Sequence, residues 1–353
     1  MTDQLAAGAQ EARPRKKPSP TVMMLGGMVV PLFLMTVLPL LYTWGLHSPT
    51  PHDMDVRIVG TSTQVEQFAQ QVQAQVGSSF DVGVVADVDA AKEAVSSLET
   101  RGAYDPATNI VYVASEGNLA AAQAVEGLFG SIAGKTVGTA PTVFDVAPTS
   151  STDRLGASLM FVGLAAILGG FLTATVLQLL LPGLSLRVEL TVIAVMSVVS
   201  AVVPAFVAYG VYGAVSGSIL EVLVLLALSA FVVGSFHLGG MRLIGPGMMI
   251  PTLLIMVLLG VPSSGAAIAP EMVPGFFTTL NNFLPTPALL EGLKRLVYFP
   301  AASIGGTVAV MAMWGFLAAG LLGLSVLRHK KDPDEPILSS FAAMPAPENG
   351  DSK

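Results

Sequence analysis

The stretch LGVPSSGAAIAPEMVPGFFTTLNNFLPTPALLEGLKRLVYFP, residues 259–300, separates two long apolar segments and lacks the pattern of a single helix. Pro262 and Pro270 interrupt it, because proline has no backbone N–H to donate to a helical hydrogen bond. Between residues 272 and 284, apolar side chains recur at helical spacing opposite threonine and asparagine. The pattern predicts a broken segment that lies in or dips into the outer leaflet of a membrane.

Irregular backbone at membrane depth is tolerated only where it is buried in protein or lines a wet cavity. The segment therefore predicts a mouth or gate, and the alternative is an interfacial brace. The candidate residues of a substrate path or gate are Pro262, Ser263, Ser264, Gly265, Phe276, Phe277, Asn281 and Asn282. On the following helix, Glu291, Lys294 and Arg295 are expected to face the lipid headgroups.

The composition of the whole chain is that of a membrane protein. Of 353 residues, 52% are hydrophobic and only 12% are charged, with a mean hydropathy of +0.69, whereas a soluble domain carries roughly 25% charged residues. The chain has no cysteine and four scattered histidines, so we expect no disulfide, no metal site and no cofactor. The net charge of −7 argues against nucleic acid as a partner.

Apolar runs predict six membrane-spanning helices, since about 20 apolar residues cross a bilayer. The first span, residues 21–46, follows a basic stretch, as the apolar core of a signal peptide would. It is too long for such a core, and Tyr42 and Trp44 lie at its end. We therefore interpret it as an uncleaved anchor. The other five lie within residues 154–328. They are residues 155–181, 190–212, 219–240, 243–261 and 301–327.

Residues 262–287 are long enough to be a seventh span, but their prolines and the charge distribution favour a re-entrant hairpin. With six spans, Arg187, Arg242 and the basic cluster 328–331 all lie on the same side as the basic residues near the amino terminus. Basic residues next to spans favour the cytoplasm. We therefore expect a multi-pass protein of the plasma membrane with both termini cytoplasmic and with disordered tails at residues 1–20 and 329–353.

Residues 47–153 differ from the rest and predict an extracytoplasmic α/β domain inserted between the first two spans. They hold thirteen acidic and four basic residues. Strand patterns alternate with helix patterns, which favours a small, mostly parallel sheet in a unit that folds independently. The predicted strands are 54–60, 80–87, 109–115 and 142–148, and the predicted helices are 63–76, 89–100 and 118–132.

Motifs of nucleotide hydrolysis or catalysis are not found. Residues 134–136, GKT, lack the earlier glycine of a phosphate-binding loop because residue 129 is phenylalanine. No acid, base and nucleophile set converges, so we expect no enzyme. His237 and Gln178 lie inside spans, each near a cytoplasmic end, and either a packing role or a transport role is open to them.

The arrangement resembles the membrane subunits of type-2 ATP-binding-cassette (ABC) exporters and their relatives similar to the phage infection protein. The resemblance rests on the order of spans and external domain, on VYVAS at 111–115 and DVAP at 145–148, and on the turn and broken hairpin before the last span. The matching residues of that hairpin are Gly260, Pro262, Ser263, Ser264, Gly265, Pro270, Pro274, Gly275, Phe276, Leu284, Pro285 and the run 296–299.

The resemblance implies a permease, as a homo- or heterodimer in the lipid bilayer, that exports a hydrophobic or amphipathic envelope molecule or drug. It also implies a separate cytoplasmic ATPase subunit, for which Arg187, Glu189 and Arg242 are the candidate coupling residues. Two features depart from such exporters: residues 1–20 have no apolar face, and the loop 182–189 is short. The alternative is a non-transporting scaffold or accessory protein of envelope biogenesis, whose external domain binds partners.

The predicted topology can be tested by cysteine labelling, because the chain has no cysteine of its own. In intact cells, an impermeant thiol reagent should label Ser97→Cys, in the predicted external domain, and should not label Ser339→Cys, in the predicted cytoplasmic tail. The reverse pattern would contradict the topology, and lysed cells, in which both sites react, are the control.

Overall fold

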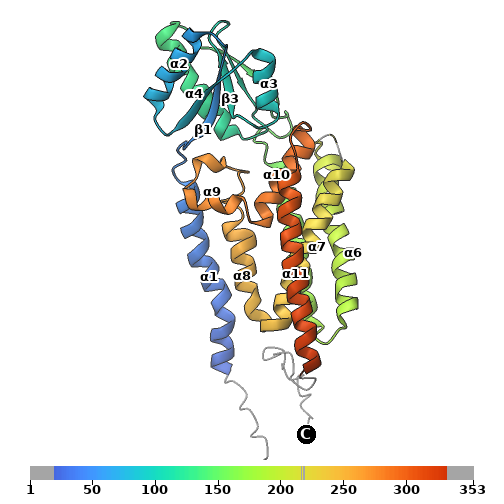
Figure 1. Cartoon of the computed structure of the whole chain (residues 1–353). Helices are drawn as coiled ribbons and strands as arrows, with labels where there is room; N and C mark the ends of the chain where they lie inside the picture. Colours follow the sequence, from blue (N-terminus) through green and yellow to red (C-terminus); the bar gives the residue numbers. More distant parts are fainter. Residues whose placement is uncertain (1–19, 216, 218, 332–353) are drawn as a thin grey trace, which may run out of the picture.

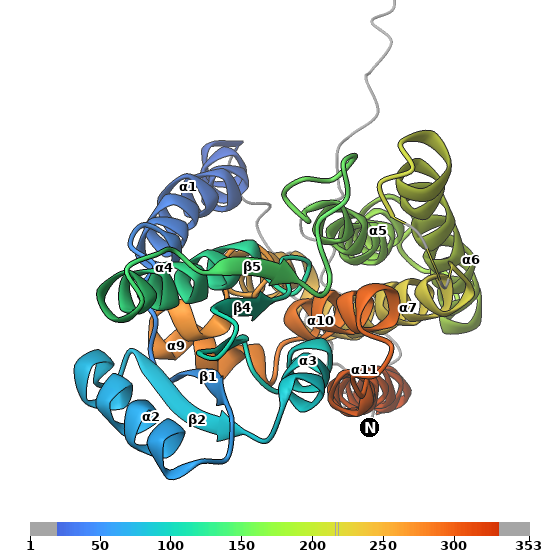
Figure 2. The same cartoon turned by 90° about the horizontal axis from the view of Figure 1, so that it is seen from above.

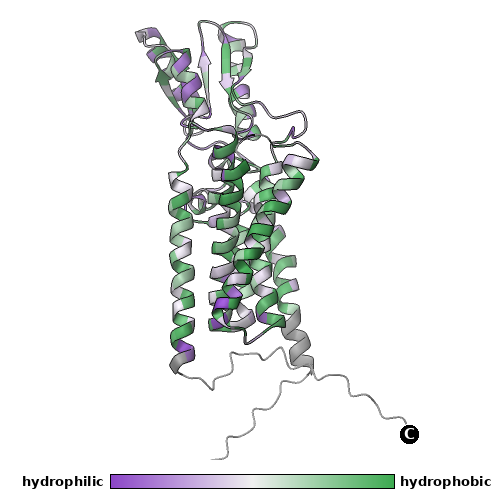
Figure 3. Cartoon of the chain, turned by 90° about the vertical axis from the view of Figure 1, so that its right-hand side faces the viewer, coloured by the Kyte–Doolittle hydropathy of each residue, from purple (hydrophilic) through white to green (hydrophobic). Residues whose placement is uncertain are grey.

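The computed structural model describes residues 20–215, 217 and 219–331. The predicted tails, 1–20 and 329–353, lie outside this part of the chain except for Pro20 and residues 329–331, which belong to helices. Figure 1 shows long helices side by side, with an α/β unit at one end. In Figure 3 the long helices are mostly hydrophobic along their length, and hydrophilic residues are more frequent in the α/β unit.

Among the described residues, five helical stretches are long and apolar enough to cross a membrane. Four of them correspond to predicted spans: Met28–Leu46 in α1 (Pro20–Leu46), α5 (Ser158–Leu180), α6 (Leu186–Ala205) with the π-helix η1 (Phe206–Val211), and the last helix, α11 (Gly305–Lys331). The fifth, Ile219–Leu259, is a 41-residue stretch that covers the two predicted spans 219–240 and 243–261.

This 41-residue stretch folds back on itself. It consists of α7 (Ile219–Ile244), the 3-10 turn η2 (Gly245–Met248), α8 (Met249–Leu253) and the π-helix η3 (Leu254–Leu259). His237 Nδ1 lies 2.8 Å from Thr252 Oγ1, although fifteen residues of straight helix would separate them by about 22 Å. Gly245, with φ +68°, makes the turn, because a positive φ favours glycine.

His237 cross-links three helices around this turn. Its side chain is fully buried, and its Nε2 lies 3.0 Å from Thr175 Oγ1 of α5. The Thr175 hydroxyl also donates to the Phe171 carbonyl, so it accepts from Nε2–H, and Nδ1 accepts from Thr252. Every polar atom of the group is thus satisfied, which supports the packing role among the two roles open to His237.

The helices of the bundle pack closely at small residues. A Cβ on Gly170 of α5 would lie 2.1 Å from the carbonyl oxygen of Ala230 in α7, so only glycine allows this approach. Helix α1, by contrast, stands apart from α5, α6 and α7, as the view from above shows (Figure 2). Only 11% of the residues in the most apolar part of α1 are buried, against 56% in the stretch that contains α7.

The α/β unit contains a five-stranded sheet in the order β2-β1-β3-β4-β5. All neighbours pair in parallel except β3 and β4, which form an antiparallel hairpin. The elements are β1 (Met54–Val59), α2 (Thr63–Val76), β2 (Phe80–Val85), α3 (Val88–Ser96), β3 (Gly102–Asp105), β4 (Ile110–Val113), α4 (Leu119–Thr136) and β5 (Thr142–Asp145).

The four predicted strands and three predicted helices are therefore present, but the expectation of only four strands is wrong. The strand that the prediction missed is β3, whose sequence GAYD is four residues long and fully buried. Asp105 Oδ1 accepts from the Ala107 N–H, and its Oδ2 accepts from the Thr108 hydroxyl. These two bonds stabilise the turn that joins β3 to β4.

Both faces of the sheet are completed by residues from the bundle side of the chain. Ala269 and Met272 belong to the core that contains Phe129 of α4. Phe299 and Ala302 belong to the core on the other face. Independent folding of this unit stays a prediction, and a fragment of residues 52–148 would lack these four apolar side chains.

The fragment 52–148 should nevertheless fold, because the described strands of the sheet and its covering helices lie within it. In this fragment, Phe129→Ala should lower the free energy of unfolding by roughly 3–5 kcal/mol, since the ring is fully buried and stacks on Tyr104. Urea denaturation followed by circular dichroism measures the change.

The matched control is Phe144→Ala on β5, whose side chain is 47% exposed. It should cost less than about 1 kcal/mol. Equal losses in the two variants, or a fragment that is unfolded without substitutions, would contradict the prediction.

Candidate functional site

The segment between η3 and α10 (Pro285–Tyr298) is built from short pieces. After η3 come turns, the 3-10 helix η4 (Pro270–Met272) and the seven-residue helix α9 (Gly275–Asn281). Gly265 has φ +67°, and a Cβ there would lie 2.9 Å from the ring of Pro270. The prolines and this glycine thus break the helix as the sequence predicts. We call residues 260–284 the broken segment.

All eight predicted gate residues belong to the broken segment, and six of them lie together in its interior. Asn281 Nδ2 donates to the carbonyl of Ser263 over 2.7 Å, and the Ser264 hydroxyl donates to the carbonyl of Val261. The side chains of Ser263 and Phe277 are fully buried. Pro262 and Phe277 both pack against Gly45 of α1, where a Cβ would lie 3.1–3.2 Å from them.

The other two predicted gate residues face outward. Phe276 is 47% exposed and stacks on Trp44 with ring centroids 5.4 Å apart. Asn282 is exposed and donates only to the Thr278 carbonyl one turn back. The predicted single apolar face is therefore wrong, since Phe277 is buried whereas Phe276 and Phe283 are exposed.

A buried lysine joins the broken segment to the α/β unit. Lys294 of α10 donates from Nζ to the carbonyls of Gly117 and Gly265, each over 2.9 Å. Asn118, the residue that caps α4, donates from Nδ2 to the same Gly265 carbonyl over 3.0 Å. Burial lowers the pKa of the Lys294 ammonium, and Glu291 opposes that shift.

The expectation that Lys294 faces the headgroups is wrong, because its side chain is only 6% exposed. Glu291 and Arg295 instead form a partly exposed ion pair on α10. An amphipathic helix that ends in charged residues does not by itself reveal this difference. The acceptor carbonyls of Lys294 come from distant parts of the chain, and no local pattern marks them.

Further contacts attach the α/β unit to the broken segment. Arg101 donates from Nε and Nη2 to Glu271 Oε1, the shorter distance being 2.8 Å. Backbone N–H groups of Thr50 and His52, which follow α1, donate to the carbonyls of Met272 and Glu271. The broken segment is thus held by α1, the α/β unit and α10 at once.

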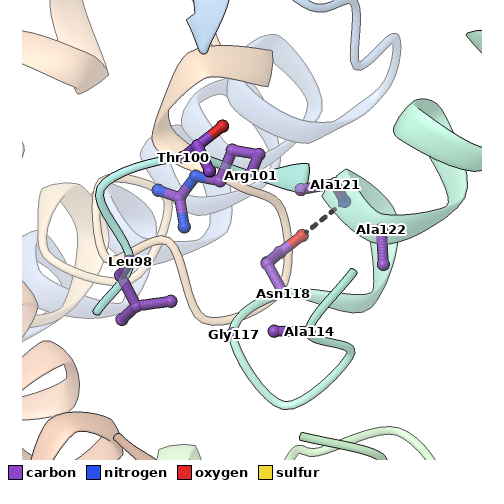
Figure 4. A pocket seen from close by; sticks show the side chains of 8 residues that line it. All are labelled: Leu98, Thr100, Arg101, Ala114, Gly117, Asn118, Ala121 and Ala122. Carbon is purple, nitrogen blue, oxygen red and sulfur yellow. Dashed lines mark hydrogen bonds between the residues drawn. The ribbon is translucent and has the colours of Figure 1, made fainter. Parts of the chain in front are cut away.

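A small pocket lies at the edge of this junction (Figure 4). Figure 4 shows the Asn118 side chain accepting a hydrogen bond from the Ala121 N–H, with Arg101 extended beside it. The pocket is narrow and combines one cationic side chain with small apolar ones. Its lining residues are Leu98, Thr100, Arg101, Ala114, Gly117, Asn118, Ala121 and Ala122.

Two of the three predicted coupling residues meet at the end of the bundle far from the α/β unit. Glu189 is buried at the start of α6, and its Oε2 accepts from Arg242 of α7 over 2.7 Å. Gln178 of α5 donates to Glu189 Oε1 over 2.6 Å. Arg187 is exposed and takes no part in this cluster, so the cluster ties α5, α6 and α7 together.

Within the described residues, no group of three or more His, Cys, Asp or Glu side chains could hold a metal ion. Comparisons with known proteins find no matching family model, no matching curated protein and no matching solved structure.

The lysine link can be tested by replacing Lys294 with methionine, which keeps the stem and removes the ammonium. Lys294→Met leaves the carbonyls of Gly117 and Gly265 without this donor, so it should lower the free energy of unfolding of the full chain by roughly 2–4 kcal/mol. Denaturation in detergent measures it. The control Lys135→Met, at an exposed lysine, should change stability by less than about 0.5 kcal/mol. Equal effects would show that the buried link adds no stability.

Proposed function

We propose that the chain is a permease-like membrane protein that moves a hydrophobic or amphipathic envelope molecule or drug, with the broken segment as its outer gate. The observation that carries this proposal is the Gly265 carbonyl, which accepts both from Asn118 of the α/β unit and from Lys294 of α10. A displacement of the α/β unit must therefore disturb the broken segment.

In this proposal the chain crosses the membrane six times, with the two arms of Ile219–Leu259 as separate crossings. Support comes from the reversal at Gly245–Met248 and from the irregular backbone of the broken segment. The α/β unit is then extracytoplasmic, the broken segment is a re-entrant hairpin, and both termini are cytoplasmic, as the basic residues favour.

The partners proposed are those implied by the resemblance to type-2 ABC exporters. Exposed apolar side chains on α1 and α6 suit contact with the lipid bilayer or with a second subunit of a dimer. An ATPase subunit would meet the cytoplasmic end of the bundle, where the Glu189–Arg242 pair and the bond from Gln178 to Glu189 connect α5, α6 and α7. The chain itself would perform no catalysis.

A second candidate function, a scaffold for envelope partners, is favoured by one feature of the sheet. Strand β5 lies at the sheet edge, and its Val143 and Phe144 are 44% and 47% exposed. An exposed edge strand with apolar side chains can accept a strand from another protein.

The asparagine pair of α9 tests the gate. Asn281→Leu removes the donor to the buried Ser263 carbonyl and should reduce efflux of an amphipathic fluorescent dye by about tenfold, the equivalent of one net hydrogen bond. Asn282→Leu, at the exposed neighbour, is the matched control and should leave efflux unchanged.

Efflux is measured in cells that express equal amounts of the two variants at the membrane. Wild-type efflux in Asn281→Leu would reject the gate, and no efflux above background in the unsubstituted protein would favour the scaffold.

A further inference from the structure

A second polar cluster lies in the junction beside the Lys294 link, and none of the interactions described above uses it. Glu116, which follows β4, is the central residue of this cluster, and its side chain is only 4% exposed. The charged and titratable groups that interact electrostatically with it are Asp145 of β5, Asp153 of the linker between β5 and α5, and Lys294 and Tyr298 of α10. Tyr209 of η1 interacts in the same way with Tyr298.

The cluster contains three buried polar atoms that have no hydrogen-bond partner among the described residues: Glu116 Oε2, Tyr298 OH and Tyr209 OH. Native proteins pair most of their buried polar atoms, so three orphans in one place need an explanation. Asp153 is fully engaged, because its two oxygens accept from the backbone N–H groups of Ala157 and Ser158 at the start of α5. Asp145 Oδ1 accepts from the backbone N–H groups of Ser115 and Ala147, so Glu116 is the carboxyl group of the cluster with a buried oxygen that lacks a partner within the described part of the chain.

The surroundings of Glu116 favour its neutral form. Burial and then the charge of Asp153 raise the pKa of Glu116 to about 7, although a hydrogen bond from the Ser150 backbone and the charge of Lys294 oppose them. The linker closes over the group, since a Cβ on Gly156 would lie 3.1 Å from Glu116 Oε2. A proton can thus be gained or lost here near neutral pH.

We propose that protonation of Glu116 controls the docking of the α/β unit on α10: the neutral carboxylic acid stabilises the closed junction, and the carboxylate opens it. The inference concerns the regulation of the proposed gate and rests on that proposed function for its role in transport.

The orphan atoms and Lys294 explain how the junction opens. In the closed junction a carboxylate at Glu116 lacks a partner for Oε2, and its one nearby cation, Lys294, is already bound to two carbonyls. Ionisation therefore draws Lys294 away from Gly265 or draws water in. Water in the open junction satisfies the hydroxyls of Tyr298 and Tyr209 as well.

The direction of the pH dependence follows from the two pKa values. Glu116 has its ordinary pKa of 4.5 when the junction is open and about 7 when it is closed. The proton therefore stabilises the closed junction fully below pH 4.5, and this stabilisation is lost as the pH rises through 7. Between pH 5.5 and pH 8 the ratio of open to closed junctions should rise by roughly 30-fold.

The test measures opening by cysteine reactivity in the full chain in lipid vesicles. Ala302 is buried in the junction core, so Ala302→Cys reacts only when the junction opens. The rate of modification of this cysteine is divided by the rate for Ser78→Cys, at an exposed site. The division removes the intrinsic pH dependence of the thiol. The normalised rate should rise more than about tenfold from pH 5.5 to pH 8. Adding Glu116→Gln should keep it low at both pH values, whereas Glu93→Gln, at an exposed acid, should leave the rise unchanged.

A flat profile in the protein with Glu116, or an unchanged rise with Glu116→Gln, would overturn the proposal. If Glu116→Gln does not fold, infrared titration of the unsubstituted protein tests the protonation of Glu116 without a variant. It should show a protonated carboxylic acid that is lost with a midpoint near pH 7, and its absence would overturn the proposal. Neither readout measures efflux, so a protein that titrates as expected but does not transport would reject the proposed function alone.

Discussion

The buried ammonium of Lys294 is the interaction on which the junction depends. A charged amine is costly to bury unless its N–H groups find acceptors, and here the acceptors are carbonyls of the α/β unit and of the broken segment. Loss of these acceptors would leave a buried charge without hydrogen bonds, so Lys294 holds Gly117 and Gly265 in place relative to α10. Three parts of the chain that are remote in sequence thus share one point, and a movement of any of them changes the hydrogen bonds of the other two.

The long helices were the most predictable part of the fold, because length and the absence of charge suffice to define them. Residues 155–181 and 301–327 coincide closely with α5 and α11 for this reason. The predicted spans 219–240 and 243–261 put the break between them a few residues before the observed turn at Gly245, because sequence patterns mark a helix end only approximately. Strand β3 was missed because four residues give no periodicity, and its pairing with β4 defines it.

The candidate site was predictable in its backbone and not in its charges. Pro262, Gly265 and Pro270 break the helix through their own covalent geometry, which the sequence shows directly. Lys294 was misplaced because its acceptor Gly117 is 177 residues away, and a lysine on an amphipathic helix commonly extends to the aqueous side. Glu116 was counted only as one acid of an acidic domain, and its burial follows from the packing of α10 and the linker against it.

The placement of polar groups along the bundle limits how it could move. The ion pair of Glu189 and Arg242 lies at one end and Lys294 at the other, and His237 lies close to Arg242 on α7, where its two ring nitrogens bond to Thr175 and Thr252. A relay of ions would need ionisable groups in sequence, and the hydrogen-bond partners of His237 are hydroxyl groups. Movement of α1 against η3 is easier, because α1 buries the smallest share of its surface among the five candidate spans. In the proposed transport function, an amphipathic molecule would pass where this packing is weakest, between α1 and the broken segment, at the contact of Gly45 with Pro262 and Phe277.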